Sequence, residues 1–177
     1  MKQDPTTPPP DPLDRFAFLS PDQADPVAVW RSPLERALAG ADTSLGIRDV
    51  SRTGKIEVRG EIAELEVEGA DTVWITPHRA LVLCDYEEAA EIRGRLSERF
   101  LAIDMTAALA GLEVRGEQLM CRLTDLDLDN LPAPGPVAHV QAVVMRDADE
   151  TFRIFFPQEY GHYVAEVVVD AAEGLRG

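Results

Sequence analysis

Short runs of apolar residues, several of them alternating with polar ones, recur along this chain and predict strands more often than helices. Residues 72–75 and 80–84 form one pair of such runs, with a short turn between them. Residues 137–145 and 152–156 form a second pair, which flanks Asp147-Ala148-Asp149. Each pair predicts a β-hairpin.

Four segments carry apolar residues at helical spacing. Two of them open with a capping residue, because Ser32 stands before Pro33 and Asp85 is followed three positions later by Glu88. The predicted helices cover about residues 32–39, 85–100, 119–123 and 157–172, and the acidic, proline-rich residues 125–136 are predicted as a surface loop.

One stretch occurs twice. Glu57-Val58-Arg59-Gly60-Glu61 returns 56 positions later as residues 113–117, and each copy ends a short predicted strand at a glycine. An acidic-apolar-hydroxyl triplet precedes each copy, Asp49-Val50-Ser51 in the first and Asp104-Met105-Thr106 in the second. The shared flank predicts an internal duplication.

These units predict an α+β fold whose halves span about residues 47–99 and 101–172, with mostly antiparallel sheets covered by three or four helices. The domain is expected to occupy residues 32–177. Residues 1–31 form an N-terminal arm rich in proline and aspartate, interrupted by the apolar run 16–19. Because proline fixes φ and removes a donor, we expect most of this arm to be extended or irregular.

The formal net charge of −15 narrows the range of partners. Nucleic-acid binding and docking on anionic membranes both draw on lysine and arginine, so neither is expected. No apolar run approaches the roughly 20 residues of a membrane span, and residues 1–12 lack the apolar core of a secretory signal. The sequence therefore predicts a cytoplasmic protein.

Metal binding is not expected either. Cys84 and Cys121 both stand in apolar runs and are interpreted as small buried side chains, with no disulfide framework. His78, His139 and His162 have no ligand spacing among themselves or with the cysteines.

The repeated polar residues admit a functional and a structural interpretation. Asp49 with Ser51, and Asp104 with Thr106, can be viewed as convergent carboxylate–hydroxyl sites, but such residues before a turn more often bind nearby backbone amides. Arg59 and Arg115 can be viewed as an anion site, although exposed positions of a half-polar strand explain them better. Gly60 and Gly116 are expected where φ is positive or packing is close.

Two further groups are weighed in the same way. Glu87, Glu88 and Glu91 can act as paired carboxylates, but the first turns of a helix favour negative charge in any case. Tyr160, His162 and Tyr163 can reach a pocket, although core or interface packing is the default for aromatic residues on a helix. No catalytic, cofactor-binding or metal-binding residue is therefore assigned.

The order of these motifs carries a family resemblance. The triplets and glycine-ended strands resemble the folate-binding domain of the glycine-cleavage T-protein (aminomethyltransferase) superfamily, and so do residues 119–128 and 152–157 and the following Tyr160. The same fold occurs in the alpha and gamma subunits of heterotetrameric sarcosine oxidase. The resemblance covers about residues 32–177.

Departures from the family pattern are informative. Folate-using members carry a long insert with paired aspartates after the first glycine, whereas here only 13 residues separate Gly60 from Trp74, and Asp71 is interpreted as a turn residue. They also carry a glycine-rich segment in the last hairpin, and residues 145–151 contain no glycine. The family's C-terminal barrel is absent from this sequence. In these respects the chain is similar to the gamma subunit of sarcosine oxidase, which implies no bound cofactor.

Two hypotheses follow. The first is a non-catalytic accessory subunit that assembles with larger flavin-bearing oxidase subunits through Phe16, Phe18, residues 27–30, Tyr160 and Tyr163. The second is a free-standing domain that binds tetrahydrofolate or another flat ring in a cavity lined by Trp74, Tyr86 or Phe156. The acidic surface and the apolar run 16–19 favour the first, and no tight folate binding is expected.

Overall fold

The structure of the protein is a computed structural model, and it describes residues 31–147 and 150–176. The chain divides between Arg31 and Ser32, and the second of the two units holds all the elements described below. Phe16, Phe18 and residues 27–30 lie outside the described residues, so the expectations placed on them stay predictions.

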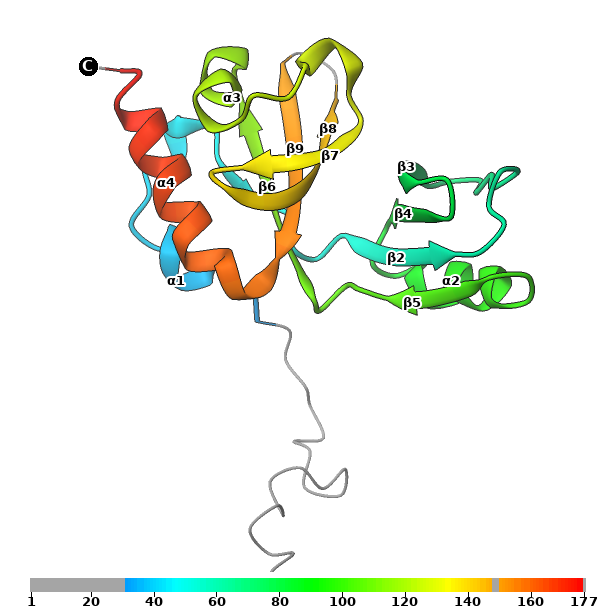
Figure 1. Ribbon diagram of the computed structural model, residues 1–177. Coiled ribbons are helices and arrows are strands. Elements are labelled where there is room, and N and C mark those ends of the chain that lie inside the picture. Colours follow the sequence, from blue (N-terminus) through cyan, green and yellow to red (C-terminus); the bar gives the residue numbers. More distant parts are fainter. Residues whose placement is uncertain (1–30, 148–149, 177) are drawn as a thin grey trace, which may run out of the picture. The chain divides into compact units, whose positions relative to one another are not determined.

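Two antiparallel sheets and four α-helices make up the described residues, which confirms the α+β class (Figure 1). The first sheet has the order β1-β6-β9-β8-β7 and the second has the order β3-β4-β2-β5. The strands of the first sheet are β1 (Arg48–Asp49), β6 (Leu109–Arg115), β9 (Thr151–Pro157), β8 (Val140–Arg146) and β7 (Ala133–Val137). Those of the second are β3 (Asp71–Thr76), β4 (Arg79–Cys84), β2 (Gly54–Arg59) and β5 (Leu101–Asp104).

Each sheet is backed by helices on one face (Figure 1). The helices α1 (Glu35–Leu38), α3 (Glu117–Leu123) and α4 (Gly161–Glu173) lie with the five-stranded sheet, and α2 (Ala89–Ser97) lies with the four-stranded sheet. Within residues 31–147 and 150–176, three short 3-10 turns complete the elements, at Thr43–Leu45, Leu128–Asn130 and Gln158–Tyr160.

Three apolar clusters hold these layers together. The largest joins Leu112, Ile154 and Phe156 of the five-stranded sheet to Met120 of α3 and Val168 of α4. The second packs Ile56, Val58 and Val82 against Ile92 and Leu96 of α2. The third lies between the sheets, where Val73, Leu81 and Leu83 meet Val143, Met145 and Phe155. The two sheets therefore pack face to face, with helices outside each.

Each repeat lends its first strand to the sheet of the other. The strand β1 precedes β2 in the chain but pairs with β6, while β5 precedes β6 but pairs with β2. The registers correspond. Asp49 lies opposite Leu112, and Asp104 lies opposite Ile56, and Ile56 is the counterpart of Leu112, 56 positions earlier in the sequence. The strands that carry Val58 and Val114 thus occupy corresponding places in the two sheets.

Several predicted elements are confirmed. Both hairpins form, as β3–β4 and β8–β9, and helices form within residues 85–100, 119–123 and 157–172. Gly60 and Gly116 have φ of 133° and 107°, as expected for residues that end these strands. Ser32 Oγ accepts a hydrogen bond from the backbone N–H of Leu34 at 3.0 Å, but the prediction of Ser32 as the N-cap is wrong, because the single-turn α1 begins at Glu35 and its N-cap is Leu34.

Other predictions are wrong, for identifiable reasons. Asp85 does not cap α2, which begins at Ala89 after a turn in which the N–H of Glu88 bonds the carbonyl of Asp85. The predicted loop 125–136 includes a 3-10 turn and most of β7. Pro134 and Pro136 suggested a loop, but β7 is an edge strand, where proline is tolerated because no neighbouring strand needs its N–H.

Candidate functional site

The repeated Asp-apolar-Ser/Thr triplets form two equivalent turns. Asp49 Oδ1 accepts the N–H of Ser51 at 2.9 Å, and Asp104 Oδ1 accepts the N–H of Thr106 at 2.9 Å. Ser51 Oγ in turn accepts the N–H of Gly111 at 3.0 Å. These contacts confirm the structural interpretation of the triplets as turns that bind backbone amides.

The second triplet makes the matching contact across to the first repeat. Thr106 Oγ1 accepts the N–H of Lys55 at 3.1 Å, and Lys55 is the counterpart of Gly111, 56 positions earlier. Each hydroxyl therefore fastens its own turn to the strand of the other repeat. Neither is positioned as a nucleophile, because each is buried and accepts a backbone hydrogen bond.

Lys55 is the feature that the sequence did not single out. Its side chain has no solvent exposure, and its Nζ donates to the carbonyls of Ser51 at 2.8 Å and Thr53 at 2.7 Å. The same Nζ lies 5.8 Å from the ring centroid of Phe155. Burial lowers the pKa of Lys55 to about 8, against the opposing attraction of Asp104 and Asp49.

The alternating pattern of β2 hid this burial. Lys55, Glu57 and Arg59 alternate with apolar residues, which predicts a solvent-facing row, and Arg59 is indeed exposed. Lys55 and Glu57, however, lie opposite Leu83 and Leu81, on the face that packs against the other sheet. The row is covered over two of its three positions.

Arg59 and Arg115 do not form a joint anion site. Both are exposed and end their strands, but those strands belong to different sheets. Arg59 Nε bonds Glu57. The two arginines share no partner among the contacts of the described residues.

A polar groove of about 680 Å³ lies beside the turn at Thr53. All of its charged groups except Asp85 are paired with one another: Arg48 with Glu113, Arg52 with Glu87, and Arg153 with Asp71 and Asp147. Its charged lining residues are Arg48, Arg52, Asp71, Asp85, Glu87, Glu113, Asp147 and Arg153.

Arg153 links the two sheets at this groove. It reaches from β9 to Asp71 of β3 at 2.9 Å and to both carboxylate oxygens of Asp147 at 2.8 Å. Burial opposes its charge, but the hydrogen bonds from Asp147 and Asp71 raise the pKa of Arg153 above its ordinary value. Asp71 is thus the first residue of a strand and an ion-pair partner, which corrects its interpretation as a turn residue.

The three aromatic residues proposed to line a ligand cavity are not brought together. Phe156 is 1% exposed in the cluster under α4, while Trp74 and Tyr86 are exposed. Of the three, only Tyr86 lines the polar groove, where the guanidinium of Arg52 lies 4.8 Å from its ring centroid.

The cysteines differ from each other. Cys84 is buried, as predicted, and burial raises the pKa of its thiol above the ordinary value. Cys121 is exposed on α3, so its interpretation as a buried side chain is wrong: the apolar spacing of α3 is carried by Leu119, Met120 and Leu123. Across residues 31–147 and 150–176, no cluster of histidine, cysteine and carboxylate side chains has the makings of a metal site.

The remaining candidates lie at helix ends. Glu87 and Glu88 stand in the turn before α2, and Glu91 lies in its first turn, all exposed. Tyr160 and Tyr163 are 46% and 44% exposed at the start of α4, and His162 Nε2 lies 3.2 Å from Glu166 on the same helix. The two tyrosines are therefore not part of the core.

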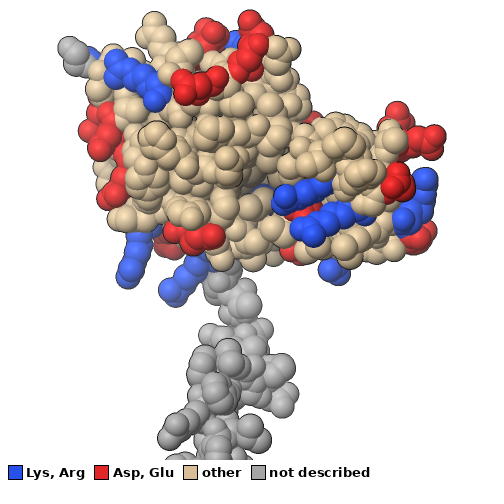
Figure 2. Space-filling model, in the orientation of Figure 1, with Lys and Arg blue, Asp and Glu red and all other residues tan. Residues whose placement is uncertain are grey.

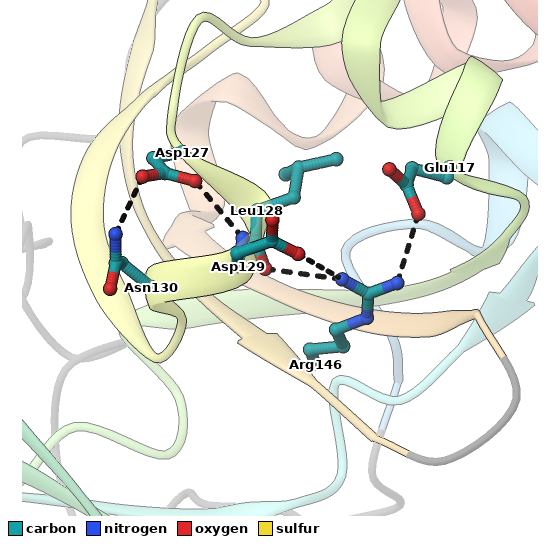
Figure 3. A network of polar contacts seen from close by, with 6 residues as sticks. All are labelled: Glu117, Asp127, Leu128, Asp129, Asn130 and Arg146. Carbon is teal, nitrogen blue, oxygen red and sulfur yellow. Dashed lines mark hydrogen bonds and ion pairs between the residues drawn. The ribbon is translucent and has the colours of Figure 1, made fainter.

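Residues 123–128, which contribute to the family resemblance, lead from the end of α3 into the 3-10 turn Leu128–Asn130 (Figure 3). Asp127 accepts the N–H of Asp129 and an amide N–H of Asn130, closing the 3-10 turn. Arg146 of β8 donates to the carbonyl of Leu128 at 3.3 Å. The same guanidinium pairs with Glu117 at 2.9 Å, so the turn, α3 and the hairpin are tied to one side chain.

The described residues thus define an α+β domain of two facing antiparallel sheets, each backed by helices, with its internal polar groups used for structure. The fold is similar to that of a chain of heterotetrameric sarcosine oxidase from Corynebacterium sp. U-96, solved in complex with pyrrole 2-carboxylate. The two chains are 15% identical, the TM-score is 0.69, and the match covers 84% of this chain and 97% of that one.

A second similar structure is the glycine cleavage system aminomethyltransferase T from Bartonella henselae, with 14% identity and a TM-score of 0.52. The match covers 77% of this chain but only 48% of that one, so this chain corresponds to about half of the enzyme. The resemblance expected from the motifs is confirmed at the level of fold. No family model and no curated protein sequence matches the chain.

None of the helices in the described residues has the length and apolar character needed to cross a membrane.

Proposed function

We propose that this protein is a non-catalytic accessory subunit of a flavin-dependent amine oxidase of the sarcosine-oxidase type, in the position of the gamma subunit. The observation that carries the proposal is the similarity in fold over 97% of one chain of a heterotetrameric sarcosine oxidase. Because the match covers nearly the whole of that chain, it favours this protein as a counterpart of the entire subunit over a protein that shares only a fragment of it. We place the complex in the cytoplasm.

The state of the polar groups supports a structural role. The hydroxyls of Ser51 and Thr106 hold backbone amides, and Lys55 is enclosed between two carbonyls. The arginines of the groove are neutralised by neighbouring carboxylates. A catalytic group needs access to substrate, which the buried Ser51, Thr106 and Lys55 lack, and the groove arginines are already engaged in ion pairs.

The start of α4 provides a candidate interface. Tyr160 and Tyr163 are exposed, and a hollow of about 270 Å³ between α4 and the β7–β8 turn is lined by Tyr163, Val167, His139 and Pro136. Figure 2 shows few charged groups over β7, and acidic groups border this surface on the side of α4, which carries the exposed Glu166 and Asp170. Tyrosine is enriched at interfaces because its ring is apolar and its hydroxyl can still be hydrogen-bonded.

We also propose that the two halves arose by duplication. The corresponding registers of β1 with β6 and of β5 with β2 support this, as do the matched hydrogen bonds of the two triplets. In this proposal the aminomethyltransferase-type fold is a pseudo-symmetric domain whose repeats exchange their first strands.

Co-expression tests the assignment. A tagged full-length chain, produced with the flavin-bearing oxidase chains of the same host, should co-elute with them as a discrete complex that absorbs at flavin wavelengths. Tyr160→Asp combined with Tyr163→Asp should reduce co-elution at least tenfold, because a charge in an interface must be desolvated. Trp74→Asp, an exposed aromatic residue on β3, is the matched control and should leave the complex intact. Recovery of the chain as a closed homo-oligomer without flavin would contradict the proposal.

The groove motivates one competing function, because its volume lies in the range of small-molecule sites. We expect no tight folate binding there. A pterin ring needs unoccupied partners for its donors, and unpaired buried groups lose on the order of 1–3 kcal/mol each. Titration calorimetry with reduced folates is the measurement, and low-micromolar affinity would show that the groove is a folate site.

A further inference from the structure

A second surface, separate from the tyrosines of α4, lies where the four-stranded sheet is not covered by the other sheet. Arg59 of β2 lies directly opposite Arg79 of β4 on one side and opposite Leu101 of β5 on the other. Residues directly opposite in antiparallel strands share a face, so the three side chains form one row, named here the Arg59 row. Figure 2 shows lysine and arginine atoms gathered over β2 and β4.

The row is exposed although it continues a buried face. On the same face of β2, the neighbouring position is Glu57, whose side chain is only 3% exposed. The side chains of Arg59 and Arg79 are 51% and 43% exposed. Leu101 is 59% exposed, more than any other large apolar residue described as exposed. The face that packs between the sheets at Leu81 therefore emerges to solvent at this row.

The charges of the row do not balance. Two guanidiniums directly opposite each other repel, and the carboxylate of Glu57 lies between them, bonded by Arg59 Nε and Arg79 Nη2. Burial raises the pKa of Glu57, but the hydrogen bonds from Arg79 and Arg59 outweigh this and hold the pKa below its ordinary value. One carboxylate therefore serves two arginines, and one positive charge is left over.

One donor of the row also lacks an acceptor. Arg79 Nε is buried and has no hydrogen-bond partner within the described residues. A buried unsatisfied donor is costly, and such groups in native structures call for an explanation. An acceptor supplied from outside this chain reaches the exposed parts of the two guanidiniums and accounts for the spare charge, whereas the buried Nε of Arg79 lies out of its reach.

We propose that the Arg59 row is a docking surface for a segment of a partner protein in which an aspartate or glutamate stands next to an apolar residue. The partner's carboxylate binds the two guanidiniums from the solvent side, opposite Glu57. Its apolar neighbour covers Leu101. Arginine suits this role because its planar fork binds carboxylates in two-point fashion.

Charge complementarity selects this occupant over two others. A small inorganic anion satisfies the arginines but leaves Leu101 in water. A second copy of this chain carries the same net charge of −15, which opposes close approach. The inference requires a protein partner but does not depend on that partner being an oxidase.

Photo-crosslinking in the native host tests the proposal. A benzophenone amino acid replaces Leu101 in the full chain, and the crosslinked peptide is sequenced by mass spectrometry. The expected product is a peptide of another protein with an aspartate or glutamate beside an apolar residue. No crosslink, a crosslink to a second copy of this chain, or a peptide without carboxylates would overturn the proposal.

The crosslinked segment, made as a synthetic peptide, then allows a quantitative test. Leu101→Glu places a competing carboxylate beside Arg59 and should weaken binding at least tenfold, without altering the urea midpoint because Leu101 is exposed. Arg59→Lys with Arg79→Lys keeps both charges for Glu57 and should also weaken binding, since lysine lacks the planar fork. Trp74→Glu is the matched control. Trp74 lies opposite Ala80, which belongs to the cluster under α2, so Trp74 is on the other face of the sheet from the Arg59 row and its substitution should leave binding unchanged.

The outcomes separate this proposal from the function proposed above. A complex with flavin-bearing chains that forms equally well with Leu101→Glu leaves the accessory role standing and overturns the docking surface. An acidic peptide captured at Leu101 from a protein unrelated to oxidases supports the docking surface, while the accessory role is decided by the co-expression test at Tyr160 and Tyr163.

Discussion

At the scale of single residues, the polar row of β2 shows two ways of burying a charge. Glu57 keeps its charge, because two arginines bond its carboxylate. Lys55 is enclosed between two carbonyls, and its lowered pKa allows it to lose its proton. The neutral amine of Lys55 still has two N–H donors, one for each of the carbonyls of Ser51 and Thr53. The alternation of β2 predicted the face on which these residues lie, but not that the other sheet covers that face.

Lys55 should make stability depend on alkaline pH. Its pKa is about 8 in the folded state and 10.5 when unperturbed, so between these values the unfolded chain binds more protons. Stability should therefore rise with pH across this window, by an amount on the order of 2–3 kcal/mol for this group. Lys55→Met should lack that rise. The free energy of unfolding of the unsubstituted protein and of Lys55→Met is measured by urea unfolding from pH 7.5 to 10. The difference between the two proteins cancels the titration of the groups that they share. If the two free energies changed in parallel with pH, the lowered pKa of Lys55 would be contradicted.

At the scale of elements, the two triplet turns should be energetically equivalent. Ser51→Ala removes the acceptor of the Gly111 amide, and Thr106→Val removes that of the Lys55 amide while keeping the side chain's shape. Each should lower the free energy of unfolding by about 1–3 kcal/mol, because a buried N–H is left unpaired. Ser97→Ala, an exposed hydroxyl on α2, is the control and should change stability by less than about 0.5 kcal/mol. Unequal losses at the two turns, measured by urea unfolding, would show that they are not equivalent.

Two glycines should respond to alanine with opposite signs. A Cβ on Gly111 would stand 2.9 Å from both the Phe155 ring and the carbonyl oxygen of Val50, and Phe155 is too buried to move aside. Gly111→Ala should therefore destabilise by about 1–3 kcal/mol. Gly94 in α2 has nothing within 4 Å of such a Cβ, so Gly94→Ala should stabilise by about 0.5–1 kcal/mol. Thermal unfolding of the two variants checks the signs, and a stabilised Gly111→Ala would contradict the close packing of β6 on β9.

Local sequence patterns predicted those elements in which apolar residues are buried and polar residues are exposed. The strand β4 and the helix α4 follow from spacing alone, since most of their apolar positions are buried, whereas Trp74 of β3 is exposed. Edge position is not a local property, so the prolines of β7 were misleading. Arg59 was predicted as exposed, but its position opposite Arg79, the spare charge and the unpaired Arg79 Nε depend on register between strands and were not visible in the sequence.

At the scale of the whole molecule, the exchange of strands between repeats explains why neither half can be complete alone. The first repeat contributes β1 to the five-stranded sheet, and the second contributes β5 to the four-stranded sheet. The repeat in the sequence indicated two similar units but not this exchange, because pairing between distant strands leaves no local signal. The third apolar cluster adds contacts between the sheets, with residues from both halves. We therefore expect residues 32–177 to unfold as one cooperative unit.

The domain boundary can be tested in the same terms. The three apolar clusters use residues from Leu34 to Leu175, so a chain of residues 32–177 contains every contact of the described core. It should fold on its own, with a urea midpoint and slope equal to those of the full chain, because the slope reports the surface exposed on unfolding. A chain cut between the halves, at Phe100, is the contrasting case: each piece would lack a strand of its sheet, and neither should give a cooperative transition. Circular dichroism during urea unfolding distinguishes these outcomes. A lower midpoint for residues 32–177 would mean that the N-terminal arm contributes to the fold, and an independently folding half would contradict the mutual dependence created by β1 and β5.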